Sequence, residues 1–342
     1  MARLKLQDLA EICQLDISTI SRGLRNDRRV SPATCQHIQR LARRLGYRPH
    51  LLARHLAGGR THTLWMILSS VEANIDHRLV RHATRRANQR GYTLIVALHD
   101  SDQPAPPERP GPEAPDSRYQ RVLGMAAQGT SDGALIIARR CSDDTPLLRE
   151  LIRQEIPLTF LDNYPEALPC PVVTTDNTEA ARALTERCAQ AGATGAFLLF
   201  DEFNPVARAR SAGARAACAE RQLPALTPAD LLAAPDAALE RLGARPAFIG
   251  STQTHHVLAW ATRFAPRLDR RRLICGVFDQ WIGDIAPADH VFVARQDEET
   301  LARHAVDQLI AQIEHRPSSA PRLVQIPLLG VTPHRAGSTA AG

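Results

Sequence analysis

The sequence predicts two kinds of fold in one chain: a small all-helical domain at the N-terminus and a larger α/β body whose parallel sheets form two lobes. Three observations support this prediction. Basic residues are concentrated in the first 60 positions, apolar residues recur at helical spacing in the first 48, and apolar strands alternate with amphipathic helices from residue 63 onward. The length of 342 residues is enough for roughly two or three domains of ordinary size.

The charge of the chain is unevenly distributed. There are 42 Lys and Arg against 36 Asp and Glu, a formal net charge of +6. Residues 1–60 hold 12 of the basic and 4 of the acidic side chains, a net charge of +8, so the rest of the chain carries −2. A basic domain joined to a nearly neutral body indicates that the N-terminal segment meets a polyanion.

Several enzyme classes are excluded by the near-absence of lysine. Lys5 is the only one, and it lies outside any glycine-rich loop. A Walker A loop, a pyridoxal enzyme and a Ser-Lys hydrolase each need a lysine in their site. The chain also lacks a G-x-S-x-G elbow. His255 and His256 are adjacent, so on a helix they point in different directions and do not form a metal site. We therefore expect no enzyme activity, no cofactor and no metal.

The cysteines and the hydropathy predict a cytoplasmic protein. Seven cysteines are scattered without a C-x-x-C pair, which argues for reduced thiols rather than disulfides or structural zinc. No apolar run approaches the roughly 20 residues that span a bilayer, and the charged N-terminus is unlike a signal peptide. We expect no membrane partner.

Three helices are expected in the first 48 residues. Apolar residues recur at helical spacing from Leu6 to Cys13, and a second helix starts at Ile17 after a short turn. A third helix starts at Pro32 and stops at Gly46. The short second helix has the position of the recognition helix in a helix-turn-helix, which enters the major groove of DNA.

The outward face of the second helix carries side chains suited to reading bases. Arg22 can donate a bidentate pair to guanine, Ser18 can bond a base or a phosphate, and Ile17 can pack on a thymine methyl. The further contacts expected are hydroxyl contacts from Thr19 and Ser21 and phosphate contacts from Arg25, Arg28 and Arg29. The alternative is an ordinary helical hairpin with a solvated charged face, which the concentration of charge disfavours.

After residue 48 the sequence predicts a linker and then a body of alternating strands and helices. Within the linker at residues 49–60, Leu51 to Leu56 could form about one and a half helical turns, which are not stable alone in water. In the body, strands are expected at 63–70, 92–100, 133–138, 157–162, 196–201, 247–252, 273–279 and 291–296, and helices at 79–90, 119–128, 146–154, 180–191, 207–220 and 237–242. We expect the chain to cross between the two sheets near residues 163 and 295, with a cleft between the lobes. The proline-rich residues 103–115 are expected to form an exposed loop.

The first 60 residues resemble the lactose/galactose repressor family of bacterial transcriptional regulators. The resemblance rests on Ala10, Glu11, Thr19, Ile20, Ser21, Arg22, Val30, Ser31, Leu45, Gly46, Tyr47 and Pro49. In this family the linker is a hinge helix that folds on operator DNA and pushes leucines into the minor groove. The resemblance assigns the wedge to Leu56 and a close contact between hinge helices to Ala53, whereas His50 stands where Asn is usual.

Residues 61–335 resemble the two-lobed, periplasmic-binding-protein-like effector domain of the same family. The matching segments are residues 131–133, 156–157, 174–177, 210–213 and 277–279. The resemblance implies a small sugar effector in the cleft, with carboxylates and arginines on its hydroxyls. The candidate effector-binding residues are Asp162, Asn163, Arg208, Arg210, Gln253, Asp279, Trp281 and Arg295.

The charge of the effector stays open between two alternatives. Where many members of the family have Asn-Asp, this chain has Thr252-Gln253. It therefore lacks a carboxylate that usually accepts hydrogen bonds from the sugar hydroxyls. The arginines near the expected cleft then suit a sugar phosphate, as in the fructose-repressor branch of the family, better than a neutral sugar.

The resemblance favours an effector-controlled repressor that binds operator DNA as a homodimer. Two alternatives are a sugar-metabolising α/β enzyme with an accessory DNA-binding head, and a solute-binding protein, which would need a secretion signal and no basic head. The expected domains are a helix-turn-helix at 1–48, a hinge helix at 49–60, a two-lobed effector domain at 61–335 and a flexible tail at 336–342.

Overall fold

The computed structural model describes residues 5–24, 26–47, 60–68, 74–98, 123–124, 129–138, 145–200, 204–250, 273–279, 288–315 and 322–333. The chain divides into two compact units, Met1–Thr61 and His62–Gly342. Within the described residues no helix is both long and apolar enough to cross a membrane. The predicted hinge helix from residue 49 to 59, the proline-rich loop and the C-terminal tail lie outside the described residues.

The N-terminal unit contains the three predicted helices: α1 (Leu6–Cys13), α2 (Ile17–Leu24) and α3 (Pro32–Arg44). Their apolar stripes meet in a small core around Leu9, Ile20 and Ile38, each fully buried. The boundaries follow local chemistry. The Ser31 hydroxyl accepts a hydrogen bond from the Thr34 amide at the start of α3, where Pro32 occupies the first turn.

Helices α2 and α3 approach each other closely at Gly23. A Cβ at Gly23 would lie 2.4 Å from Ile38 Cδ1. After α3 the chain turns through Gly46, whose φ is +65°, a conformation that glycine adopts without steric cost. The head is therefore held by a few tight apolar contacts, which leave the outer face of α2 uncovered.

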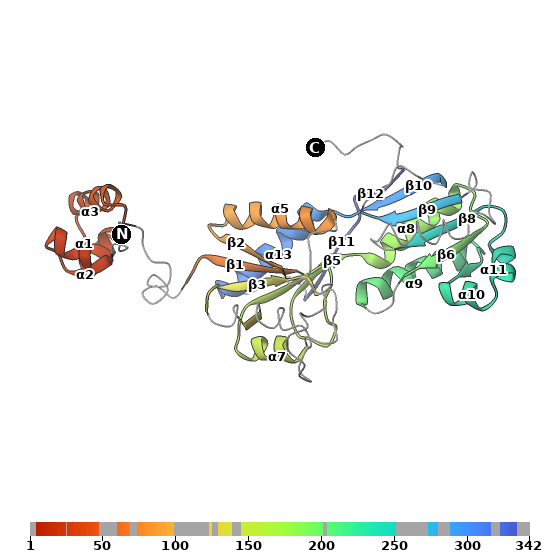
Figure 1. The fold of residues 1–342 in the computed structure, drawn as a ribbon, viewed down its shortest axis with the longest axis horizontal. Helices are drawn as coiled ribbons and strands as arrows, with labels where there is room; N and C mark the ends of the chain where they lie inside the picture. Colours follow the sequence, from red (N-terminus) through yellow and green to blue (C-terminus); the bar gives the residue numbers. More distant parts are fainter. Residues whose placement is uncertain are drawn as a thin grey trace, which may run out of the picture. The chain divides into compact units, whose positions relative to one another are not determined.

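The second unit contains two six-stranded sheets (Figure 1). The first has the order β11-β5-β4-β3-β1-β2, and the second the order β12-β10-β9-β8-β6-β7. The strands of the first sheet are β1 (Thr63–Leu68), β2 (Thr93–Leu98), β3 (Gly133–Ile136), β4 (Leu158–Leu161), β5 (Val172–Thr175) and β11 (Leu323–Ile326). Those of the second are β6 (Gly195–Leu199), β7 (Ala225–Leu226), β8 (Pro246–Gly250), β9 (Leu273–Phe278), β10 (Ala288–Arg295) and β12 (Gly330–Pro333).

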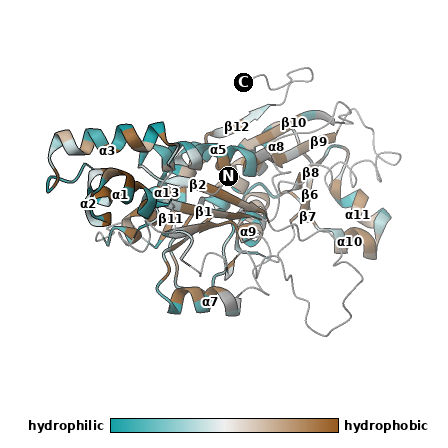
Figure 2. Cartoon of the chain, turned by 60° about the vertical axis from the view of Figure 1, so that its left-hand side comes forward, coloured by the Kyte–Doolittle hydropathy of each residue, from teal (hydrophilic) through white to brown (hydrophobic). Residues whose placement is uncertain are grey.

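Helices cover both faces of each sheet, so each lobe has three layers. On the first sheet, α5 (Asn74–Gln89) and α13 (Glu298–Ile313) pack on one face and α7 (Thr145–Arg153) on the other. On the second sheet, α8 (Asn177–Gln190) and α9 (Pro205–Glu220) pack on one face, and α10 (Pro228–Ala233) and α11 (Pro235–Leu242) on the other. Figure 2 shows the matching pattern, with apolar central strands and a polar visible side on α5.

Helices α8 and α9 lie unusually close together. A Cβ at Gly213 of α9 would lie 2.0 Å from the Thr178 carbonyl oxygen of α8. A side chain at this position would therefore force the helices apart. This contact fixes α9, and with it Arg210, against the start of α8.

The predicted strands of the body are confirmed, but the crossings between the lobes are only partly as predicted. The first crossing was expected near residue 163. Instead β5 continues the first sheet, and the chain crosses at Asp176. The second crossing follows Arg295 as predicted, and a third, between β11 and β12, was not predicted. Among the described residues the strand pairings are parallel, except that β12 is antiparallel to β10.

The sequence analysis missed six of the described elements of the body: β5, β7, β11, β12, α10 and α13. Strand β5 has only four residues, too few to show a period. Helix α13 does carry a clear signal, because its buried apolar residues recur at helical spacing; they are Leu301, Ala302, Ala305, Val306, Leu309 and Ile310.

Candidate functional site

The outer face of α2 is available for contact with a ligand. Ile17 is 47% exposed although it is a large apolar residue, and Ser18 beside it is also exposed. Thr19, Ser21 and Arg22 are half-buried, while Ile20 faces the core as predicted. The face thus combines an apolar side chain, hydroxyls and a guanidinium, which together can contact base edges in a major groove.

The loop after α2 presents two exposed arginines, Arg28 and Arg29. Arg29 forms a bidentate ion pair with Asp27: its Nε lies 3.0 Å from Oδ1 and its Nη2 lies 2.7 Å from Oδ2. These bonds hold the pKa of the Asp27 carboxyl well below its usual value. Arg25, Ala53 and Leu56, the other predicted contacts to DNA, lie outside the described residues.

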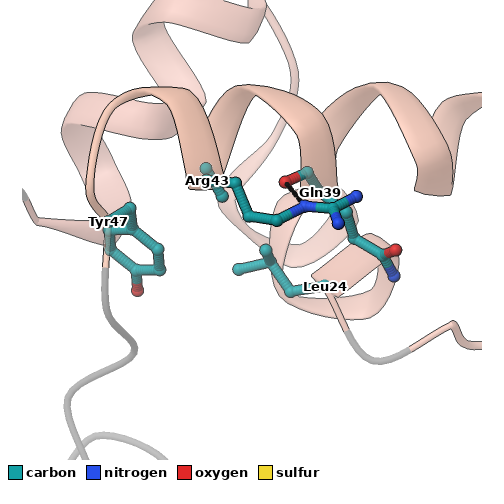
Figure 3. Close-up of a pocket in the computed structure, with 5 residues that line it drawn as sticks. Leu24, Gln39, Arg43 and Tyr47 are labelled. Atoms are coloured by element: carbon teal, nitrogen blue, oxygen red, sulfur yellow. Dashed lines mark hydrogen bonds between the residues drawn. The ribbon is translucent and has the colours of Figure 1, made fainter.

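A pocket in the head lies beside the C-terminal half of α3 (Figure 3). Leu24 of α2 and Gln39, Ala42, Arg43 and Tyr47 line it. The Nε of Arg43 donates to the Gln39 carbonyl oxygen at 3.3 Å, so this arginine is tied to its own helix. We assign no ligand to the pocket.

In the body, the predicted carboxylates Asp162 and Asp279 follow equivalent strands of the two sheets. Asp162 follows β4 and Asp279 follows β9, each the third strand in its sheet order. Both have a left-handed backbone, with φ of 64° and 68°, and both are buried. This strained conformation is uncommon for a residue other than glycine and is found often at functional sites. It occurs here at the carboxyl ends of parallel strands, where α/β proteins bind ligands.

Arg210 of α9 is the cation that faces these carboxylates. Its side chain is 2% exposed, its Nε donates to Asn177 Oδ1 at 2.8 Å, and its Cζ lies 3.8 Å from the centre of the Phe278 ring. Burial lowers the pKa of Arg210, and the charges of Asp279 and Asp162 oppose that change. Arg210 thus lies close enough to Asp162 and Asp279 to interact with both charges, and its direct contacts are Asn177 and Phe278.

Two buried residues that link this cluster to the crossings were not predicted as site residues. The Gln296 Nε2 donates to Asp279 Oδ1 at 2.7 Å, and the Gln296 Oε1 accepts from the Thr175 hydroxyl. Thr175 precedes the first crossing and Gln296 precedes the second. The position of Gln296 directly after a predicted strand was the signal available in the sequence, but only the fold places it beside Thr175, the last residue of β5.

Three oxygens of the cluster have no hydrogen-bond donor among the described residues: Asp162 Oδ1, Asn163 Oδ1 and Asp279 Oδ2. Buried acceptors without donors are costly. Such atoms can be satisfied by a bound molecule that brings hydroxyl or amine donors. The cluster is thus chemically suited to a hydroxyl-rich ligand.

The other predicted effector-binding residues are placed differently. Arg208 is exposed and pairs with Glu166, with 2.6 Å between Nη2 and Oε2. Arg295, the last residue of β10, is also exposed. Gln253 and Trp281 lie outside the described residues. Among the residues that the structure does describe, no group of His, Cys, Asp and Glu could hold a metal ion.

The chain resembles curated bacterial regulators over part of its length. It is 26% identical over 162 residues to the ribose operon repressor of Escherichia coli (strain K12), covering 47% of this chain and 44% of that protein. It is 26% identical over 222 residues to the HTH-type transcriptional repressor PurR of Vibrio parahaemolyticus, covering 64% and 62%. The chain thus spans about half the length of the first curated relatives it matches. No protein-family model matches it.

Solved structures share the fold over nearly the whole chain. The Lac repressor dimer bound to operator and the anti-inducer ONPF superposes with a TM-score of 0.72 at 18% identity, covering 99% of this chain and 100% of that one. The Cra regulator of Pseudomonas putida in complex with fructose 1-phosphate gives a TM-score of 0.58 at 20% identity, covering 80% and 98%.

The fold defines a helical head joined to a two-lobed α/β body with a polar cluster at the carboxyl ends of both sheets. The chain shares this architecture with the Lac repressor structure, and over part of its length it is similar in sequence to curated transcriptional repressors.

The buried carboxyl of Asp279 makes the stability of the body depend on pH. Burial raises its pKa from 3.8 to about 7, although Arg210 and the Gln296 amide oppose the rise. The folded state then binds more protons than the unfolded state between these values, so stability falls as the pH rises through this window. The fall is at most roughly 1.4 kcal/mol per pH unit.

We expect the Asp279→Asn variant to lose this dependence. Its urea midpoint should change less between about pH 5 and about pH 8 than that of the wild type. Glu240→Gln, an exposed carboxyl of α11 in the same lobe, serves as the control and should keep the wild-type slope. Equal slopes for all three proteins would contradict the assignment.

Proposed function

We propose that the protein is a DNA-binding transcriptional regulator, acting as a repressor, whose affinity for its operator is controlled by a small sugar bound between the two lobes. One observation carries the proposal: the same chain contains a basic helix-turn-helix and a polar cluster at the carboxyl ends of both sheets. In that cluster the buried Arg210 lies near the carboxylates of Asp162 and Asp279. The relatives' names support it, since they are those of operon repressors.

In the head, α2 would lie in the major groove with Ile17, Ser18 and Arg22 toward base edges. Arg22 would read a guanine, while the exposed Arg28 contacts phosphate. We further propose that residues 49–60 form a hinge helix on DNA, in which Leu56 wedges into the minor groove and Ala53 contacts the partner's hinge.

In the body, the effector would bind on Asp162, Asn163 and Asp279, whose unpaired oxygens accept hydrogen bonds from sugar hydroxyls. We favour a neutral sugar over a sugar phosphate. Three arginines could bind the phosphate of a sugar phosphate. Arg208 already pairs with Glu166, and Arg210 lies near two carboxylates. Arg295 forms no ion pair with any described residue, which leaves one exposed cation for a phosphate.

Effector binding would act on the crossings between the lobes. Asp162 belongs to the first sheet and Asp279 to the second, so a ligand that bridges them favours one angle between the lobes. It shifts the equilibrium only by the difference in its affinity for the two states. The buried bond between Thr175 and Gln296 holds the two crossing segments together, so a change at Asp279 would be felt there.

We propose that the protein is not an enzyme and that it acts in the cytoplasm, because the named relatives are regulators and a regulator must reach DNA. We also propose a homodimer. Strand β2 is an edge of the first sheet and exposes Ile95, Val96 and Leu98. An apolar edge strand left in water invites pairing with another chain, and a second copy would cover it while supplying the second recognition helix.

The DNA-binding proposal is tested by selecting duplexes from a random library with the full chain. Arg22→Ala should relax the preference at one position of the selected site. Arg28→Ala should weaken binding to all sequences alike and reduce the dependence on salt by about one phosphate contact. A uniform loss with both variants would contradict base reading by Arg22, and no enrichment with the wild type would contradict the proposed function.

The effector proposal is tested by calorimetry with D-ribose, D-fructose and fructose 1-phosphate. We expect a neutral sugar to bind and Asp279→Asn to weaken that binding by at least about ten-fold, because a hydrogen bond to a buried charge is lost. Glu240→Gln should bind as the wild type does. Binding of fructose 1-phosphate alone would favour the sugar-phosphate alternative.

The dimer proposal is tested by sedimentation. Val96→Lys places a charge on the exposed edge of β2 and should convert the dimer to a monomer. Leu232→Lys makes the same kind of change at another exposed apolar residue, on α10, and should leave the dimer intact. A dimeric Val96→Lys variant would exclude β2 from the interface.

A further inference from the structure

The loop between α2 and α3 holds one arginine in a fixed orientation. Arg29 binds Asp27 through one edge of its guanidinium, the edge formed by Nε and Nη2, and its backbone amide also donates to Asp27 Oδ1 at 3.0 Å. The Arg29 side chain is 69% exposed and that of Asp27 is 22% exposed. The other edge of the guanidinium, which includes Nη1, accordingly remains open to solvent and can still donate.

Asp27 is itself attached to the end of the recognition helix. Its amide donates to the Arg22 carbonyl oxygen at 3.1 Å, and its carbonyl accepts from the Val30 amide at 3.0 Å. Gln39 of α3 fixes the same turn, donating to the Gly23 carbonyl and to Asn26 Oδ1. Arg29 is therefore held at a set distance from Arg22, in the loop that directly follows α2.

Two effects of Asp27 on DNA binding have opposite signs. Its negative charge repels phosphate, but that charge is neutralised by a bidentate partner. An unpaired arginine loses side-chain freedom when it binds a phosphate, whereas a guanidinium that is already fixed loses little. Bidentate pairs keep their geometry better than single contacts, so pre-orientation outweighs the weak repulsion between exposed charges.

We propose that Asp27 is a positioning residue for DNA binding: it orients Arg29 so that the free edge of the guanidinium meets a backbone phosphate beside the groove that α2 enters. The inference rests on the proposed function and adds an acidic residue to a surface that otherwise binds DNA by positive charge.

The test measures binding of the full chain to a 30-base-pair duplex of random sequence over a range of salt concentrations. Asp27→Asn should lower the affinity by about 3- to 10-fold, although it removes a negative charge from the head. Glu11→Gln, an exposed residue of α1, changes the net charge equally and should leave the affinity unchanged or slightly higher. In the Arg29→Ala background the effect of Asp27→Asn should vanish, while in the Arg28→Ala background it should persist.

Each other outcome overturns the inference. If Asp27→Asn raises the affinity as much as Glu11→Gln or more, then Asp27 merely neutralises Arg29. If Asp27→Asn lowers the affinity equally with and without Arg29, then its role is structural, in the loop. If the wild type shows no salt-dependent binding to the duplex, the proposed function itself fails, and that result is distinct from the other two.

Discussion

The burial of Arg210 near the carboxylates that follow two equivalent strands is the interaction on which the body of this protein depends. Arg210 comes from α9, Asp162 follows a strand of the first sheet and Asp279 follows the equivalent strand of the second. A buried charge is tolerated only with partners, and the Arg210 guanidinium donates to Asn177 and packs on the Phe278 ring. Burial raises the pKa of Asp279 to about 7, although Arg210 and the Gln296 amide oppose the rise. Asp162 and Asp279 each have a buried oxygen without a donor among the described residues, which a ligand could satisfy.

The cluster also lies where the chain passes between the lobes. Thr175 is the last residue of β5 and Gln296 follows β10, so both lie at the first two crossings, and a buried hydrogen bond joins them. Gln296 then donates to Asp279. With Nε2 donating to Asp279 Oδ1, the Gln296 Oε1 accepts from the Thr175 hydroxyl, so one amide side chain contacts both residues. A ligand that binds Asp279 would thus be separated from the crossing residue Thr175 only by the side chain of Gln296.

The head differs from the body in its core, its charge and the exposure of its functional groups. Its core is small, its charge is high, and its functional groups are exposed. With Lys5 as the only lysine, the positive charge rests almost entirely on guanidinium groups. A guanidinium has two edges that can each form a bidentate contact, whereas an ammonium is a point charge. This difference allows Asp27 to hold Arg29 through one edge while the other edge stays open.

The sequence by itself determined the head and most strands of the body. Those features depend on local chemistry: the cap at Ser31, the turn at Gly46, helical spacing and short apolar runs. It also predicted that Asp162 and Asp279 lie at the carboxyl ends of buried strands, where the structure places them. Only the tertiary structure decided the crossing at Asp176, the antiparallel β12 and the contacts of Thr175 and Gln296. These features depend on which sheet a strand joins or on contacts between residues far apart in the chain, such as Thr175 and Gln296, which are 121 positions apart. No local pattern encodes them.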